Sequence, residues 1–359
     1  LKPSGSRCRI SGRGPMETFV CPACRNVVAA DRREAHETRW CPALPQSDSE
    51  EEENPEPKGN LARMGGARAE LSPLLQEVIT VAFGSRSELS FDLEQEDIFG
   101  PLDTGGALWY ADRVMSQFLV TAGSGAVTSQ GGGSGPGRVP AGGLALVLGC
   151  GGVPLSAFVA AALGWSVVMT DLEPVIELTR TNVRRASAVV QAERDRRACT
   201  QPIEMVVREL WFGDEPALDE ALAAAGAVGE GAPLLVLCSD CIWREFLHRP
   251  LLGTVACALG KASGAAEALL CFQTRSPQNE ALFMKILEEE FGCLEVQAVD
   301  ASEALSEVLW PAQVQHSVGN LDLPQNFPLL RLKLREGEAP PRVSAPKEVA
   351  TAARKPWWS

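Results

Sequence analysis

Apolar runs and helical patterns alternate from residue 144 to about residue 335. Short apolar runs, typical of buried strands, are followed by segments whose apolar residues recur at helical spacing. Regular alternation of this kind indicates an α/β fold with a mainly parallel, doubly wound sheet. The sequence predicts seven strands, at 144–149, 166–170, 203–208, 233–238, 267–272, 294–299 and 328–334, and helices at 155–163, 173–186, 247–260 and 278–290.

The rest of the chain differs in composition. Residues 67–122 mix short strand patterns with a helical stretch, "ALWYADRVMSQFLV", and residues 123–143 read as a flexible Gly/Ser insertion. We therefore expect a leader at 1–16, a small cysteine-bearing domain at 17–44, an acidic disordered linker at 45–66, one catalytic domain at 67–335, and a disordered tail at 336–359.

Composition narrows the function classes. The 359-residue chain is 45% hydrophobic and carries a formal net charge of −13. A nucleic-acid partner is not expected, because phosphate-tracking surfaces need clustered Lys and Arg. A membrane span is not expected either, because no apolar run approaches about 20 residues. A protein or small-molecule partner fits better.

The cysteines and the first residues bear on the compartment. Apolar runs contain Cys150, Cys238, Cys257, Cys271 and Cys293, where a thiol behaves as a small buried hydrophobe. Unpaired core cysteines indicate a reducing compartment, the cytoplasm or the nucleus. The basic stretch before Met16 could be a transit peptide, but we expect Met16 to be the start of the protein.

A glycine-rich turn follows the first strand of the predicted sheet. Gly149, Cys150 and Gly151 open a turn that should present backbone N–H groups to an anionic group of a ligand. Asp171 ends the next strand, where a carboxylate can accept hydrogen bonds from both ribose hydroxyls. The alternatives are an ordinary tight turn and Asp171 as a helix N-cap.

The turn also discriminates between cofactors. A dinucleotide site favours the pattern G-x-G-x-x-G, and Pro154 stands where its third glycine would be. S-adenosylmethionine (SAM) sites tolerate a looser turn, so SAM is favoured over NAD.

Three further stretches, "TGGALWYADRVMSQFLV", "RELWFGDE" and "SDCIW", flank this turn in order. With "LVLGCGGVPLSAFVAAALGWSVVMTDLEPVIELTRTNV", the chain over roughly residues 76 to 335 resembles the seven-strand protein lysine methyltransferases of methyltransferase family 16. The resemblance implies a Rossmann-like seven-strand fold and SAM as cofactor. It also implies a cofactor site made of Trp109 as a wall, Gly149, Cys150 and Gly151 at the methionine, Asp171 at the ribose, Phe212 or alternatively Trp211 at the adenine, and Ser239 lining the pocket.

The same resemblance gives acceptor residues. Asp240 and Trp243 match the family's Asp-x-x-Tyr/Phe motif at the substrate lysine, and a free Asp240 carboxylate would face the methyl group's destination and stabilise charge on the attacking nitrogen. Alternatively, Asp240 is a helix cap and Trp243 is core. The chain departs from the family at Val147, where an acidic residue usually precedes the glycine turn, and in having Trp at 243.

The N-terminal cysteines have metal-ligand spacing. Cys21, Cys24, His36 and Cys41 form the pattern C-x2-C-x11-H-x4-C, typical of a structural zinc site. A segment this short has too little core to fold alone, so zinc would supply its folding energy. The segment resembles small CCHC zinc fingers, including ones that bind ubiquitin, so an adaptor or ubiquitin-like partner is expected for it.

The leading hypothesis is a SAM-dependent methyltransferase acting on a protein lysine. Two alternatives stay open: a SAM-dependent enzyme with another acceptor, such as histidine, arginine or a small molecule, and a non-catalytic binding protein.

Overall fold

The computed structural model divides the chain into two compact units, Leu1–Arg68 and Ala69–Ser359. The structure describes residues 18–20, 27–29, 78–83, 89–96, 103–124, 143–224, 231–308 and 323–341. In the first unit, the strands β1 (Thr18–Val20) and β2 (Val27–Ala29) pair antiparallel, with Phe19 opposite Val28. The expected zinc ligands, the linker, most of the 123–143 insertion and most of the tail lie outside the described residues.

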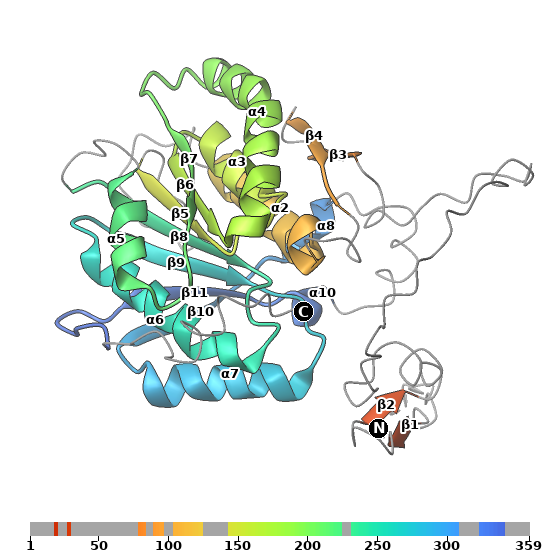
Figure 1. Cartoon of the computed structure of the whole chain (residues 1–359), viewed down its shortest axis with the longest axis vertical. Coiled ribbons are helices and arrows are strands. Elements are labelled where there is room, and N and C mark those ends of the chain that lie inside the picture. The colour runs from red at the N-terminus through yellow and green to blue at the C-terminus, as the bar shows by residue number, and fades with distance from the viewer. Residues whose placement is uncertain are drawn as a thin grey trace, which may run out of the picture. The chain divides into compact units, whose positions relative to one another are not determined.

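The second unit contains a sheet of seven strands in the order β10-β11-β9-β8-β5-β6-β7 (Figure 1). Its strands are β5 (Leu144–Leu148), β6 (Ser166–Asp171), β7 (Met205–Glu209), β8 (Leu234–Ser239), β9 (Ala266–Cys271), β10 (Leu294–Val299) and β11 (Leu329–Leu334). The five strands from β5 to β9 are parallel, while β11 runs antiparallel to both β9 and β10. Every residue of β5 is buried, which explains its unbroken apolar run.

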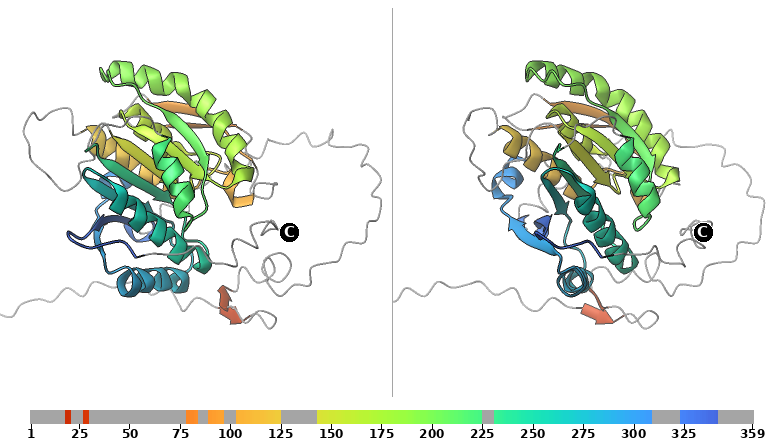
Figure 2. Two further views of the ribbon diagram at one scale, coloured as in Figure 1. Left: turned by 60° about the vertical axis from the view of Figure 1, so that its left-hand side comes forward. Right: turned by 90° about the vertical axis from the view of Figure 1, so that its left-hand side faces the viewer.

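Helices cover both faces of this sheet (Figure 2). One face packs α2 (Tyr110–Ser124), α3 (Leu155–Ala162) and α4 (Glu173–Arg196), and the other packs α5 (Glu215–Ala223), α6 (Glu245–Lys261) and α7 (Pro277–Glu290). Each face has its own apolar core, one around Phe158 and Trp165 and the other around Leu252 and Phe283. This arrangement confirms the predicted doubly wound α/β fold.

A hairpin and three short helices complete the first face. A hairpin of β3 (Val78–Ala82) and β4 (Ser90–Glu94) lies against α4, where the Asn182 side chain bonds both the N–H and the carbonyl of Glu94 (2.7 and 2.6 Å). The short helix η4 (Asp103–Gly106) precedes α2, and α8 (Ser302–Glu307) and α10 (Leu323–Asn326) lie between β10 and β11 in the chain.

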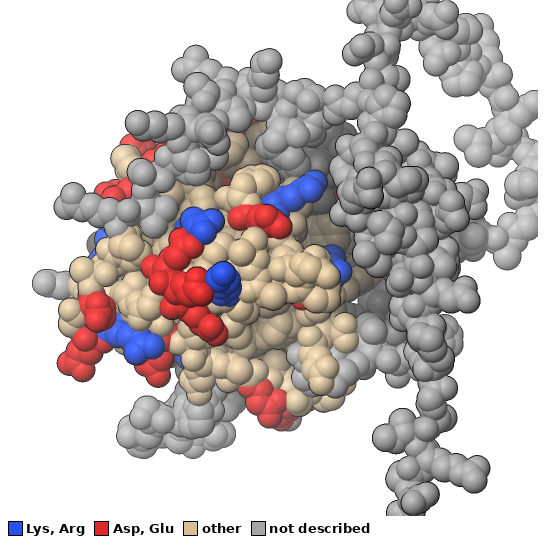
Figure 3. Space-filling view, turned by 90° about the horizontal axis from the view of Figure 1, so that it is seen from below, with Lys and Arg blue, Asp and Glu red and all other residues tan. Residues whose placement is uncertain are grey.

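Figure 3 views the protein from the side of α7, and acidic and basic side chains are mixed over this surface. Among the exposed groups, Arg249 of α6 donates two hydrogen bonds to Glu290 of α7 (2.7 and 2.5 Å). Within the described part of the chain, no helix combines the length and apolar character that crossing a membrane requires.

The predicted elements between 144 and 334 are present, with shifted ends. Helix α4 continues ten residues beyond the predicted end, because Val190 and Glu193 are buried against the fold. The sequence missed α5 and α8, each of which buries only two of its residues. The expectation for the cysteines was partly wrong: Cys257 lies in α6 and Cys293 just before β10, and both are only half-buried.

Candidate active site

The ten residues predicted to bind the cofactor or the acceptor surround one cavity. It has a volume of about 440 Å³ and opens at the edge of the sheet where the parallel strands end. Open α/β sheets bind their ligands at this edge, because the loops after several strands converge there. The predicted residues on its wall are Trp109, Gly149, Cys150, Gly151, Asp171, Trp211, Phe212, Ser239, Asp240 and Trp243.

The turn after β5 requires glycine. Gly149 and Gly151 have φ angles of +59° and +66°, in the left-handed region that favours glycine. A Cβ atom on Gly149 would lie 2.9 Å from Cys241 Sγ and 3.2 Å from Phe212 Cζ. Phe212 therefore reaches across the turn, and the lack of a side chain at Gly149 leaves room for it.

The expectation that this turn offers its N–H groups to an anionic ligand group was wrong. The N–H of Cys150 donates to the Thr170 carbonyl (3.0 Å), and the N–H of Gly152 donates to the Gly105 carbonyl (2.7 Å). The N–H of Gly151 donates to the Asp171 carboxylate (2.8 Å). Because these three donors are already used inside the protein, the turn holds its own shape and does not present them to a ligand.

Asp171 fixes the turn and faces the cavity. Its Oδ2 accepts from the Gly151 N–H, and its Oδ1 accepts from the Leu172 N–H (2.7 Å). Burial raises the pKa of the Asp171 carboxyl group, and these two backbone hydrogen bonds oppose the rise. The N-cap of α4 is Leu172, which makes no side-chain cap, so Asp171 is not the N-cap of that helix.

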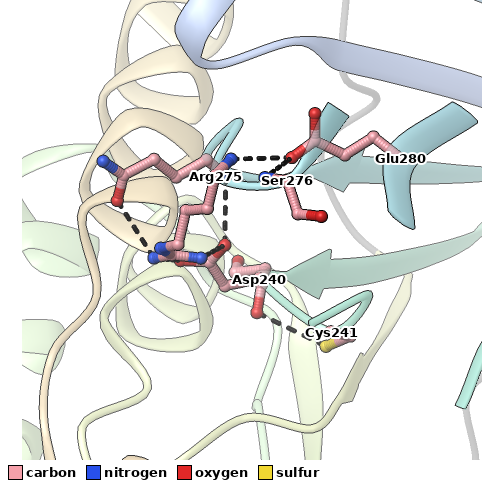
Figure 4. Close-up of polar contacts among 7 residues, drawn as sticks. Asp240, Cys241, Arg275, Ser276 and Glu280 are labelled. Carbon is pink, nitrogen blue, oxygen red and sulfur yellow. Dashed lines mark hydrogen bonds and ion pairs between the residues drawn. The ribbon is translucent and has the colours of Figure 1, made fainter. Parts of the chain in front are cut away.

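Asp240 was expected to be free, and it is not (Figure 4). Its two carboxylate oxygens accept parallel hydrogen bonds from Arg275 Nη1 and Nη2, both 2.8 Å long, and Oδ1 also accepts from the Gln273 N–H (3.0 Å). Asp240 follows β8 and Arg275 follows the neighbouring β9, so the sheet itself brings them together. The Asp240 side chain is 7% exposed, whereas that of Arg275 is 39% exposed.

Arg275 is held on its other side as well. Its guanidinium carbon lies 5.0 Å from the centre of the Trp109 ring, a cation–π distance. The backbone N–H groups of Arg275 and Ser276 both donate to Glu280 Oε1 (2.7 and 3.0 Å), and Ser276 is the N-cap of α7. The loop that carries Arg275 is thus fixed to the start of that helix.

Trp243 and Phe246 form an aromatic part of the cavity wall near the start of α6. Trp243 is half-buried, and the Arg244 guanidinium carbon lies 4.9 Å from its ring centre. Phe246 is 59% exposed, which is unusual for a large apolar side chain. Trp243 is therefore not plain core.

Sequence reasoning missed Asp112, a third carboxylate on the cavity wall. It lies in α2, and its oxygens accept from the Ser239 hydroxyl (2.8 Å) and the Ser156 N–H (3.2 Å). Burial raises the pKa of the Asp112 carboxyl group, and its hydrogen bonds oppose the rise. In the sequence, the signal for this residue is an acidic side chain within an otherwise apolar helical pattern, beside Ala111, Val114 and Met115, all of which are buried in the structure.

The predicted metal ligands Cys21, Cys24, His36 and Cys41 lie outside the described residues. In the described part of the chain, no group of three or more His, Cys, Asp or Glu side chains could hold a metal ion.

Two family models match the chain. Residues 17–42 match a C2HC zinc finger, and this range contains all four predicted zinc ligands. Residues 88–290 match the lysine methyltransferase family, and this range contains every predicted cofactor and acceptor residue. The chain belongs to the lysine methyltransferase family. It is a SAM-dependent methyltransferase with an N-terminal zinc-finger segment.

Solved structures with similar folds include three methyltransferases. A TehB-like SAM-dependent methyltransferase from Corynebacterium glutamicum is 13% identical, with 65% of this chain and 92% of that chain covered and a TM-score of 0.34. A putative methyltransferase from Thermobifida fusca is 14% identical, with 65% and 82% covered and a TM-score of 0.34. A geranyl diphosphate methyltransferase in complex with sinefungin is 9% identical, with 55% and 72% covered and a TM-score of 0.31. A comparison with curated proteins gave no match.

The cavity fits SAM in its chemistry. Its wall is mainly apolar, as the wall of a small-molecule site usually is, and it includes the carboxylates of the buried Asp112 and the half-buried Asp171. SAM has an α-ammonium group, a sulfonium and ribose hydroxyls that carboxylates can contact, and it lacks the anionic pyrophosphate of a dinucleotide. The departure from the G-x-G-x-x-G pattern agrees with this.

Proposed function

We propose that this protein transfers the methyl group of SAM to the side-chain amine of a lysine in a protein substrate. The observation that carries the proposal is that one cavity joins the glycine turn and Asp171 to Asp240 and Trp243. The match to a family described as lysine methyltransferase supports the same acceptor.

We assign the cofactor residues as follows. Asp171 accepts hydrogen bonds from the ribose hydroxyls, since its carboxylate lies at the end of β6 on the cavity wall. Gly149, Cys150 and Gly151 line the methionine, and Trp109 and Ser239 wall the site. Phe212 stacks on the adenine, with Trp211 as the alternative.

The bound cofactor supplies a methyl group already activated by its sulfonium. The protein therefore has to align the acceptor nitrogen and exclude water. The nitrogen forms its bond to the methyl carbon as the carbon–sulfur bond breaks. A lysine ammonium must first lose a proton to water. The largely apolar wall of the cavity favours the neutral amine, because desolvation disfavours the charged form.

The acceptor side of the cavity suits a lysine on a protein. Trp243 flanks the methylene stem, and the exposed Phe246 beside it offers apolar surface to a macromolecule. Asp240 acts here through its pair with Arg275, which keeps this wall polar but close to neutral. We place the reaction in the cytoplasm or nucleus.

We further propose that the N-terminal segment binds one structural zinc ion through Cys21, Cys24, His36 and Cys41. The match of residues 17–42 to a C2HC zinc finger supports this assignment. A finger of this kind would serve as an adaptor for a protein partner, of which ubiquitin is one candidate.

The test uses SAM labelled in its methyl group, the full-length protein and a protein extract from cells lacking it. We expect label in protein, recovered as methyllysine after acid hydrolysis. Trp243→Ala should lower transfer to the substrate without changing SAM affinity measured by calorimetry. Label on another amino acid would show that this amino acid, and not lysine, is the acceptor. SAM binding with no transfer to any acceptor would overturn the enzymatic proposal.

A further inference from the structure

Asp112 is a buried carboxylate with unused hydrogen-bonding capacity on the cofactor cavity. Asp112 is 7% exposed and lies on the cavity wall. One oxygen accepts from the Ser239 hydroxyl and the other from the Ser156 N–H. A carboxylate has about four lone-pair sites, and these two bonds use two of them, although the Ser156 hydroxyl and the Leu155 N–H also stabilise its charge. The buried Arg113 beside it in the chain is attracted by the Asp112 charge, but among the described residues no lysine or arginine lies within ion-pair distance of Asp112.

The surroundings of Asp112 favour a cation. The N–H groups of Cys150, Gly151 and Gly152 are used inside the protein, so this end of the cavity has few donors left. Val147, which is 2% exposed, lines the same cavity, so β5 contributes no acidic side chain there. A buried charge of this kind is costly unless an opposite charge arrives.

We propose that Asp112 binds the α-ammonium group of SAM, in place of the acidic side chain that β5 lacks at Val147. The proposal rests on the use of SAM but not on the identity of the acceptor. Ser156 lies in the first turn of α3, directly after the glycine turn, and Ser239 ends β8. Their two hydrogen bonds orient the carboxylate at the methionine end of the cavity. The ammonium would then make charge-assisted hydrogen bonds to it.

The test compares ligands that share the adenosine and the sulfur of SAM. SAM carries the ammonium and the carboxylate, decarboxylated SAM keeps the amine alone, and 5′-methylthioadenosine has neither and, as a neutral thioether, also lacks the sulfonium charge. S-adenosylhomocysteine is a neutral thioether that keeps the ammonium and the carboxylate, so it controls for the sulfonium charge and should be weakened by Asp112→Asn as SAM is. Calorimetry with the full chain should show that Asp112→Asn weakens SAM and decarboxylated SAM at least about ten-fold, as expected for lost charge-assisted hydrogen bonds. Its affinity for 5′-methylthioadenosine should stay within about two-fold of wild type.

A matched control variant is Asp171→Asn, which changes the other carboxylate on this wall. Because all of these ligands carry the ribose, this variant should weaken all of them. The proposal is overturned if Asp112→Asn weakens all of the ligands equally, which would make Asp112 a structural cap of α3. It is also overturned if SAM is weakened and decarboxylated SAM is not. These readouts need no acceptor, so they stay separate from the test of lysine methylation.

Discussion

The carboxylate of Asp240 and the guanidinium of Arg275 form a two-bonded ion pair, 2.8 Å at each bond, on the wall of the cofactor cavity. Asp240 holds a left-handed φ of +58°, a conformation that asparagine also tolerates. Under the proposed function, the acceptor amine would meet a paired carboxylate and a guanidinium stacked on Trp109, not a lone negative charge.

This pair should act as a unit. In a double-mutant cycle of Asp240→Asn and Arg275→Met, the free energies of unfolding in urea should be non-additive by about 1 kcal/mol or more. The same cycle on the exposed pair Arg249 and Glu290 should give about 0.5 kcal/mol, because solvent screens it. Arg275→Lys should restore only part of the coupling, since an ammonium cannot make two parallel bonds. Additive effects at Asp240 and Arg275 would show that the two residues are independent.

Asp171→Asn should weaken SAM binding by about ten-fold or more, because hydrogen bonds to a charged group contribute about 1.5–3 kcal/mol. The variant also weakens the bond from the Gly151 N–H that fixes the turn. Calorimetric titration with SAM measures the loss, and circular dichroism checks that the fold is kept. Wild-type affinity in a folded variant would exclude Asp171 from the ribose site.

At neutral pH and without ligand, the charged Asp112 carboxylate should lower the free energy of unfolding. Burial raises the folded-state pKa of its carboxyl group above the unfolded value, so folding disfavours the charged form. This cost shrinks as the pH falls below the folded-state pKa and is gone below the unfolded-state pKa. Without SAM, Asp112→Asn should therefore have a higher Tm than wild type at pH 7, and the difference should shrink on acidification. Thermal unfolding between pH 7 and pH 4 measures it. A lower Tm for the variant at pH 7 would contradict this account.

Cys21→Ser and His36→Ala should each release zinc from the N-terminal finger. Removing one ligand leaves a segment whose folding depends on the metal, so residues 17–44 should unfold. The affinity for SAM should not change, because every cavity residue lies in the second unit. Metal content is measured by mass spectrometry of the purified variants. Unchanged zinc in either variant would exclude that residue as a ligand.

The sequence by itself determined the sheet and ten of the residues on the cavity wall. Buried parallel strands are apolar on both faces, so runs such as "LALVL" are visible without a structure, and the residues that follow them must gather at one edge of the sheet. Gly149, Asp171 and Asp240 could be located for that reason. The helices α5 and α8 were missed because each buries only two residues and so has a weak apolar pattern, whereas α3, which is shorter than α5, is buried along its whole length and was predicted.

Only the tertiary structure decided which partners these side chains have. Asp240 and Arg275 are 35 residues apart, and their pairing follows from β8 and β9 being neighbours in the sheet. The N–H groups of the glycine turn are used by carbonyl and carboxylate groups from other elements, which no local pattern shows. Asp112 reaches the cavity because α2 packs beside α3, so its side chain meets Ser156 and Ser239. Local sequence determines strands and turns, whereas hydrogen-bond partners across the fold depend on how those elements pack.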